Sequence, residues 1–302
     1  MSDFLEAVIR GLGNGSVYAL LALGFVIIYK ATGVISFAQP AMMVSGVVVV
    51  SYLIPALALG SETLTFVVAL ALGAIAAAAL ALGVERAAVR PMVGKPVFAV
   101  AIITVGLDIA IRVVANGFIG LGARPIDNPW GLDRFEFFGV AVQWRHVAVL
   151  ATVIVVLTVL FWFFRFTRHG LAMRAAGFDQ EAALTQGMSV GSVFAMAWAM
   201  AAALATIGGT FLATVSGVDQ QLWIVALAAL PAIVLGGLDS LAGAVVGGLA
   251  VGLVESLVGT YQRDLAPWLG DNVDRVSPYV LMLVVLLVRP YGLFGTPEVR
   301  RV

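Results

Sequence analysis

The chain has 302 residues, of which 62% are hydrophobic and only 11% are charged, and its formal net charge is zero. Its mean hydropathy of +1.06 is far above that of a soluble domain, so lipid must be its solvent. Because cysteine is absent, disulfides, thiolate metal sites and thiol nucleophiles are excluded. The two histidines, His146 and His169, are too far apart for an H-E-x-x-H zinc site. We therefore expect no catalytic or metal-binding residues, and nothing indicates nucleic acid as a partner.

Apolar runs of about 17–25 residues recur along the whole chain, which is the length that a helix needs to cross a bilayer. The expected spans are about 12–29, 41–59, 64–83, 97–119, 146–164, 193–214, 222–238, 241–260 and 277–289. We therefore expect an all-α polytopic membrane protein with about eight or nine transmembrane helices, forming one domain over residues 1–302. Gly and Pro interrupt the segments near 34–44 and 222–260, so one or more of these helices should be broken or re-entrant.

The distribution of Lys and Arg predicts the orientation of the chain in the membrane. Most of these residues fall on the side that holds the loops at 84–96 and 165–192 and the C-terminus, whereas the acidic residues collect on the other side. We therefore expect the C-terminus to be cytoplasmic and, with an odd number of spans, the N-terminus to be external. The loop at 120–145 is then external, and its alternating apolar pattern at 135–142 indicates a small hairpin.

A short helical pattern lies in the loop at 165–192, in the stretch "MRAAGFDQEAALTQGMSVGSV" (Met173–Val193). Asp179 can cap this helix, Glu181 suits the dipole of its first turn, and Gly187 is a natural left-handed stop. A helix of two turns is unstable alone in water, so it must dock on something. The alternative is an ordinary connector that rests on the lipid headgroups.

Two other features stand out within the apolar runs. Pro40 can begin a helix, which leaves the preceding "GVISFAQ" non-helical. Irregular backbone at membrane depth must line a cavity or be buried in protein; the alternative is a plain interfacial turn. In the span at 97–119, Asp108 and Arg112 are ionisable groups at mid-membrane, where such groups suggest a function. The alternative is that they pair with each other across one helical turn.

Two pairs of glycines, Gly243/Gly247 and Gly248/Gly252, form small-x-x-x-small steps in the span at 241–260. Such steps allow close approach between helices, so we expect them to serve packing. "GLGNGS" (Gly11–Ser16) lacks the lysine of a phosphate-binding loop and is interpreted in the same way.

The whole chain resembles the permeases of branched-chain amino acid ABC transporters (LivH type). The resemblance rests on five stretches in order: "GSVYALLALGFVIIYKATGVISFAQPAMM" (Gly15–Met43), "VERAAVRPMVGKP" (Val84–Pro96), "AIITVGLDIAIR" (101–112), "AIVLGGLDSLAGAVVGGLAVGLVESL" (Ala232–Leu257) and "LVRPYGLFG" (Leu287–Gly295). Their order and spacing over almost the full chain are specific to this family. The resemblance implies an ABC importer permease fold in the plasma membrane.

The resemblance also implies a function and a set of partners. The chain would be the membrane-spanning subunit of an ATP-driven importer for branched-chain amino acids or related small polar compounds. It would work with a second permease subunit, two ATPase subunits and an extracellular binding protein, in membrane lipid. No G-x-x-x-x-G-K-[ST] motif occurs, so ATP would be bound and hydrolysed by the partner subunits, and the chain itself would be no enzyme and need no cofactor.

Two sets of residues acquire roles through the resemblance. The first set forms a helix that couples the permease to the ATPase, and comprises Gly177, Asp179, Glu181, Ala182 and Gly187. The second set faces the translocation pathway, and comprises Ser36, Phe37, Ala38 and Gln39, with Asp108 and Arg112 as further candidates. Ser36, Gln39, Pro40 and Ala41 depart from the family's usual residues, which bears on the identity of the substrate.

Two other classes of protein stay open as alternatives. A self-contained secondary transporter or channel would need ion-coupling carboxylates in several spans, and only Asp108 clearly qualifies. An intramembrane enzyme would need a nucleophile–base pair or a metal set, and the sequence contains neither pattern.

Overall fold

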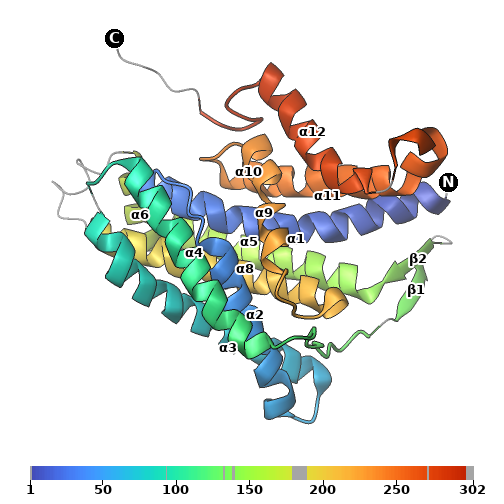
Figure 1. Cartoon of the computed structure of the whole chain (residues 1–302), viewed down its shortest axis with the longest axis horizontal. Helices are drawn as coiled ribbons and strands as arrows, with labels where there is room; N and C mark the ends of the chain where they lie inside the picture. Colours follow the sequence, from blue (N-terminus) through green and yellow to red (C-terminus); the bar gives the residue numbers. More distant parts are fainter. Residues whose placement is uncertain are drawn as a thin grey trace. The chain divides into compact units, whose positions relative to one another are not determined.

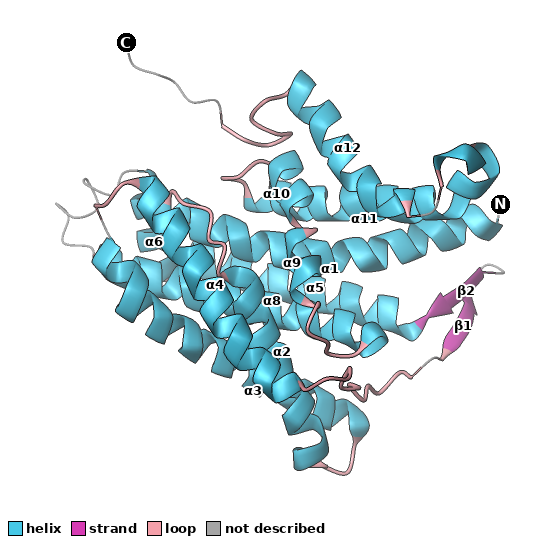
Figure 2. Cartoon of the chain, viewed as in Figure 1, coloured by secondary structure: helices cyan, strands magenta, loops and turns pink. Residues whose placement is uncertain are grey.

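The computed structural model describes residues 2–92, 94–131, 133–137, 140–178, 189–270 and 272–296. This part of the chain is almost entirely helical (Figures 1 and 2), as expected in lipid, where every backbone polar group needs an internal partner. Seven of the described helices are long and apolar enough to cross a membrane: Asp3–Thr32, Gln39–Leu57, Glu62–Met92, Val97–Ile119, Trp144–Phe166, Val190–Ser216 and Leu241–Asp264. The predicted all-α membrane architecture is thus confirmed.

The chain divides into two compact units. The terminal unit comprises residues 1–26, 130–153 and 228–302, and the core unit comprises residues 27–129 and 154–227. The helices α1 (Ser2–Thr32) and α5 (Trp144–Phe166) contribute to both units. Each unit is described separately below.

In the core unit, α2 (Gln39–Leu57) packs against α3 (Glu62–Val84), α4 (Val97–Ile119), α8 (Val190–Ser216) and the short α9 (Trp223–Leu227). Small residues bring these helices close together. A Cβ atom at Gly46 would collide with Thr206 of α8, and one at Gly209 would collide with Met43 of α2. Close approach of this kind is the main source of helix association in lipid, which offers no hydrophobic driving force.

Three short helices of the core unit lie near the ends of the long ones. A π-helical turn (Glu85–Val89) and a 3₁₀ turn (Arg90–Met92) continue the chain directly from α3. The helix α6 (Arg168–Phe178) follows α5 and contacts α8.

In the terminal unit, the first part of α1 packs on α11 (Leu241–Leu265) through glycines. A Cβ atom at Gly252 would collide with the Gly15 backbone, and one at Gly248 would collide with Ala19. The other glycine pair meets the short helix α10 (Leu230–Gly236): Gly247 lies against Ala232, and Gly243 lies against Gly236. The predicted role of both glycine steps in helix packing is therefore confirmed.

The rest of the terminal unit is a hairpin and the C-terminal helices. The strands β1 (Arg134–Phe137) and β2 (Val140–Gln143) pair antiparallel, with Arg134 opposite Gln143, which confirms the predicted hairpin. The 3₁₀ turn Pro267–Leu269 leads to α12 (Val273–Val288), which packs on α10 and α11.

The structure differs from the predicted spans in three places. The segment at 222–238 is two short helices, α9 and α10, because a new helix begins at Leu230 with Pro231 in its first turn, and Gly237 ends it with a φ of +105°. This is a broken segment of the kind expected from its Gly and Pro. The C-terminal helix α12 begins earlier than expected and has 16 residues, and α1 begins at Ser2, with Asp3 in its first turn.

Candidate functional site

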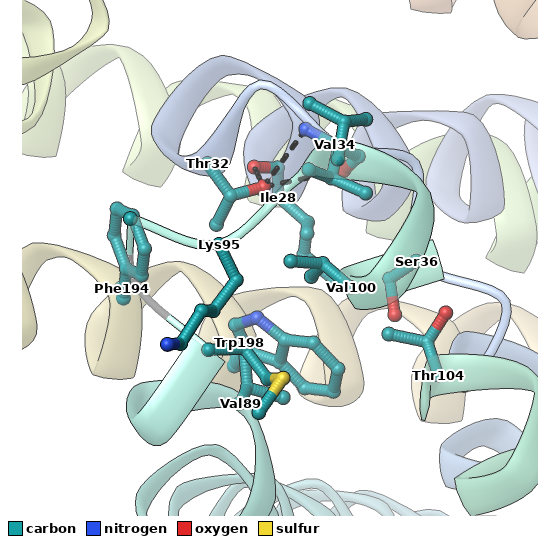
Figure 3. A pocket seen from close by; sticks show the side chains of 13 residues that line it. Ile28, Thr32, Val34, Ser36, Val89, Lys95, Val100, Thr104, Phe194 and Trp198 are labelled. Atoms are coloured by element: carbon teal, nitrogen blue, oxygen red, sulfur yellow. Dashed lines mark hydrogen bonds between the residues drawn. The ribbon is translucent and has the colours of Figure 1, made fainter. Parts of the chain in front are cut away.

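The segment at 33–38 interrupts the helices of the core unit between α1 and α2, as its sequence predicts. Gly33 adopts a φ of +72° and donates its N–H to the Tyr29 carbonyl at 2.7 Å, which ends α1. The Thr32 hydroxyl donates to the Ile28 carbonyl at 2.8 Å and accepts from the Val34 amide at 3.2 Å (Figure 3). Pro40 lies in the first turn of α2, where it needs no N–H partner. Local hydrogen bonds therefore satisfy part of this irregular backbone.

A cavity of about 200 Å³ lies beside this segment, within the core unit (Figure 3). It is lined by Ile28, Thr32, Val34, Ser36, Val89, Met92, Gly94, Lys95, Val97, Val100, Thr104, Phe194 and Trp198. Most of this lining is aliphatic or aromatic, and a few polar groups lie among it. Apolar walls with a small number of polar groups are typical of sites for small molecules.

Two polar groups in the cavity lining lack a hydrogen-bond partner. The Ser36 side chain is 1% exposed and its Oγ is unbonded, and the indole Nε1 of Trp198, a residue that is 2% exposed, is likewise unbonded. Lys95 lines the same cavity with an exposed side chain. An unpaired polar group away from water costs free energy. A polar ligand that forms hydrogen bonds with these groups would remove that cost.

From the edge of this cavity, polar residues continue along one face of α4. Thr104, Asp108, Arg112 and Asn116 are four residues apart, the spacing that places side chains on one face of a helix. The first of them contacts the irregular segment: the Phe37 amide donates to the Thr104 hydroxyl at 3.1 Å. We call these four residues the polar stripe of α4.

The ion pair at the centre of the polar stripe forms as the sequence predicts. Arg112 Nη2 lies 2.6 Å from Asp108 Oδ2, and the Arg112 guanidinium lies 3.9 Å from the ring centroid of Trp223. Asp108 is 8% exposed, and its carboxylate also faces the backbone amide of Ala41 in the first turn of α2. A carboxylate is stabilised near a helix N-terminus, so the acid has two sources of stabilisation.

The polar stripe is not fully satisfied by these contacts. Asp108 Oδ1, Arg112 Nε and Asn116 Oδ1 are buried atoms without a hydrogen-bond partner. Native structures keep few such atoms, and each requires an explanation. These atoms remain able to form hydrogen bonds with a polar ligand.

The other residues predicted to face the pathway lie in different surroundings. The Phe37 side chain is 37% exposed and the Gln39 side chain is 1% exposed, and neither lines the cavity. Ala38 belongs to a hydrophobic cluster with Ile28 and Trp198. The cavity thus includes Ser36 from this set, and the polar stripe includes Asp108 and Arg112.

The predicted coupling residues are mostly outside the described part of the chain. Gly177 lies in α6, one residue before its end, whereas Asp179, Glu181, Ala182 and Gly187 fall in the undescribed range 179–188. Their assignment stays a prediction.

One ion pair near this loop was missed at the sequence level. Arg90 donates from Nε and Nη2 to the two carboxylate oxygens of Glu85, at 3.1 and 2.9 Å, and from Nη2 to the Gly191 carbonyl of α8 at 3.1 Å. Glu85 is fully buried. A separation of five residues does not place two side chains on one face of an α-helix, but the π-helical turn brings Glu85 and Arg90 together.

Thr104, Asn116 and Trp223 were also missed. The four-residue spacing of polar residues through the span at 97–119 is a pattern from which Thr104 and Asn116 could have been found. Trp223 comes from a distant part of the sequence and has no comparable local pattern.

Comparisons with known sequences place this chain in a family. The sequence matches the family described as "Branched-chain amino acid transport system / permease component" over residues 7–287. The "High-affinity branched-chain amino acid transport system permease protein LivH" of Escherichia coli (strain K12) is 30% identical over 312 residues, which cover 99% of this chain and 98% of that protein. The corresponding BraD protein of Pseudomonas aeruginosa is 29% identical over 308 residues, with the same coverage.

Among solved structures, "PsaBC from Streptococcus pneumoniae in complex with Fab" matches with a TM-score of 0.49 and 14% identity, over 93% of this chain and 91% of that chain. The family match covers nearly the whole sequence and includes both the irregular segment and the polar stripe of α4. The chain therefore belongs to the family of permease components of branched-chain amino acid transport systems.

Proposed function

We propose that this chain is the transmembrane subunit of an ATP-driven importer, and that it translocates branched-chain amino acids or closely related small polar compounds. The observation that carries the proposal is the family match over residues 7–287. The cavity and the polar stripe of α4 support it, because they provide both apolar surface and unpaired polar atoms within the core unit.

The chemistry of the candidate pathway suits an aliphatic amino acid. A zwitterion brings an ammonium group and a carboxylate, and the unpaired Asp108 Oδ1 and Arg112 Nε are complementary to those two charges. In the cavity, Trp198 Nε1 can donate to a carboxylate, and Ile28, Val89 and Phe194 offer apolar contact to an aliphatic side chain.

The proposed function requires partners. We assign ATP binding and hydrolysis to two separate ATPase subunits, substrate delivery to an extracellular binding protein, and completion of the pathway to a second permease subunit. The helical pattern at 178–187 would dock on an ATPase subunit. In the proposed orientation the C-terminus and the loops at 84–96 and 165–192 are cytoplasmic, and the cavity near Lys95 is at the cytoplasmic end of the pathway.

Purification from the native membrane distinguishes this proposal from a self-contained transporter. A tag on this chain should recover an ATPase subunit and a permease partner in stable stoichiometry after mild solubilisation. ATP hydrolysis by the recovered complex should increase when the substrate-loaded binding protein is added. Recovery of the chain alone, with solute transport that depends on an ion gradient and not on ATP, would contradict the proposal.

A further inference from the structure

A second cavity lies in the terminal unit and has no place in the proposed transport pathway. Its volume is about 210 Å³, and it is lined by Glu6, Ile9, Arg10, Asn14, Arg134, Ala141, Gln143, Arg145 and His146. Three elements form it: the first turns of α1, the hairpin β1–β2 and the first turn of α5. We call it the basic cavity, because three arginines and a histidine line it together with one acid.

Among the described residues, none forms an ion pair with the arginines of the basic cavity. Within the described part of the chain, Arg10, Arg134 and Arg145 have no carboxylate within 4 Å, although Glu6 lines the same cavity with an exposed side chain. Arg145 Nε is buried and has no hydrogen-bond partner. Arginines that line one cavity without an ion-paired acid repel one another, so an anion in the basic cavity would relieve that repulsion.

Two contacts hold the basic cavity in shape. Arg10 donates from Nε to the Ser256 hydroxyl at 3.1 Å and from Nη2 to the Thr260 hydroxyl at 2.6 Å, which fixes its guanidinium against α11. His146 is 9% exposed and lies against Gly13, where a Cβ atom would collide with the imidazole ring. A guanidinium fixed by neutral hydroxyls keeps its charge available for a ligand.

The surroundings of the basic cavity are those of a membrane interface. It lies where the membrane-spanning helices α1 and α5 begin. Trp144, at the start of α5, is 48% exposed and packs in a tilted orientation against Phe135 of the hairpin, with ring centroids 4.6 Å apart. Exposed tryptophan at the end of a spanning helix is typical of the headgroup level. Further along α5, Val147 and Leu150 are each 38% exposed and offer apolar surface to an acyl chain.

We propose that the basic cavity binds the phosphodiester headgroup of an anionic phospholipid. Arg134 and Arg145 would contact the phosphate oxygens. Arg10 of α1, which its hydrogen bonds hold against α11, would add a third positive charge, and the acyl chains would lie along the exposed apolar side of α5. Arginine is well suited to this ligand because its planar guanidinium binds phosphate through two parallel hydrogen bonds.

The test uses the complete transporter complex, purified through this chain and placed in nanodiscs that contain phosphatidylglycerol and phosphatidylcholine with identical acyl chains. Native mass spectrometry measures which lipid stays bound. The wild type should retain phosphatidylglycerol preferentially. Arg134→Gln with Arg145→Gln should reduce that preference about twenty-five-fold, because each basic residue near an anionic surface contributes about fivefold. Arg165→Gln, at the other end of α5, removes an exposed arginine outside the basic cavity and should leave the preference unchanged.

A single substitution guards against the case in which the double variant fails to fold. Arg134 is exposed on the hairpin, so Arg134→Gln alone should fold normally and should still weaken the preference by about fivefold. Equal retention of the two lipids by the wild type would overturn the proposal.

Two further measurements distinguish a bound phospholipid from other ligands of the basic cavity. If inorganic phosphate at millimolar concentration displaces phosphatidylglycerol completely, the basic cavity is a site for a free oxyanion and the lipid assignment is wrong. If the variants keep the lipid preference but no longer respond to the binding protein, the basic cavity contacts an acidic protein surface and the lipid assignment is again wrong.

Discussion

At the scale of single residues, the ion pair Asp108–Arg112 is the feature that bears most directly on both stability and the proposed pathway. A lone charge at the centre of a spanning helix costs about 2.5–3.5 kcal/mol, and the 2.6 Å contact between the two groups lowers that cost. The second oxygen of the acid and the Nε of the base stay unpaired. A pair that is neutral as a whole, yet has free hydrogen-bonding atoms, can persist in the membrane and still bind a polar solute.

Removing one member of the pair should affect folding before it affects transport. Asp108→Asn leaves the charge of Arg112 without a counter-ion, and we expect a loss of stability of about 2.5–3.5 kcal/mol, seen as reduced membrane expression. The double variant Asp108→Ser with Arg112→Gln removes both charges and should express normally. If the pair lines the pathway, the double variant will show altered uptake or altered substrate choice; normal uptake by this variant would restrict the pair to a structural role.

At the scale of elements, close backbone contact holds α1 against α11. Gly252 faces the Gly15 backbone, and this contact leaves no room for a side chain. Gly252→Ala should therefore destabilise the protein by about 1–3 kcal/mol, measured as a lower midpoint of thermal unfolding in detergent. Gly117→Ala is the matched control, because Gly117 lies in α4 with nothing within 4 Å of an added Cβ atom. A similar loss of stability in both variants would show that helix contact is not the cause.

The link between Glu85, Arg90 and the first turn of α8 is a second interaction between elements. Replacing Arg90 with Gln leaves a fully buried carboxylate without its partner. We expect a loss of about 1.5–3 kcal/mol, the usual contribution of hydrogen bonds to a charged group. The measurement is the midpoint of thermal unfolding of Arg90→Gln. The control is Arg86→Gln, because the Arg86 side chain is exposed. Equal stability of the two variants would contradict this role of Arg90.

The coupling loop also belongs to this scale. If the helical pattern at 178–187 docks on an ATPase, replacing Ala182 or Gly187 with tryptophan should abolish the substrate-stimulated part of ATP hydrolysis by the complex while membrane insertion stays normal. The control is basal hydrolysis, which belongs to the ATPase subunits. Unchanged stimulation in both variants would mean that another segment transmits the signal.

The sequence predicts some of these elements better than others, for physical reasons. The seven spans, the hairpin and the glycine contacts follow from local periodicity, because lipid imposes helix length and small residues permit close approach. The Asp108–Arg112 pair follows from a four-residue spacing. The Glu85–Arg90 pair depends on a π-helical turn, and the contact of Arg112 with Trp223 depends on tertiary packing, so local spacing predicts neither.

At the scale of the whole molecule, the distribution of charge predicts the orientation in the membrane. The native chain has no cysteine, so single cysteines report exposure without background. A cysteine at Gly122, in the loop expected to be external, should react with an impermeant reagent in intact cells, whereas a cysteine at Gly177 should react only after permeabilisation. Labelling of the cysteine at position 177 in intact cells would contradict the proposed topology.

The central claim is that this chain forms the membrane pathway of an ATP-driven importer for aliphatic amino acids. The most direct measurement is uptake of radiolabelled leucine, isoleucine and valine by proteoliposomes that contain the complete complex, with the cognate binding protein outside and ATP inside. We predict uptake that requires both ATP and the binding protein. Uptake that proceeds without ATP, or a functional complex that transports none of these amino acids, would contradict the claim.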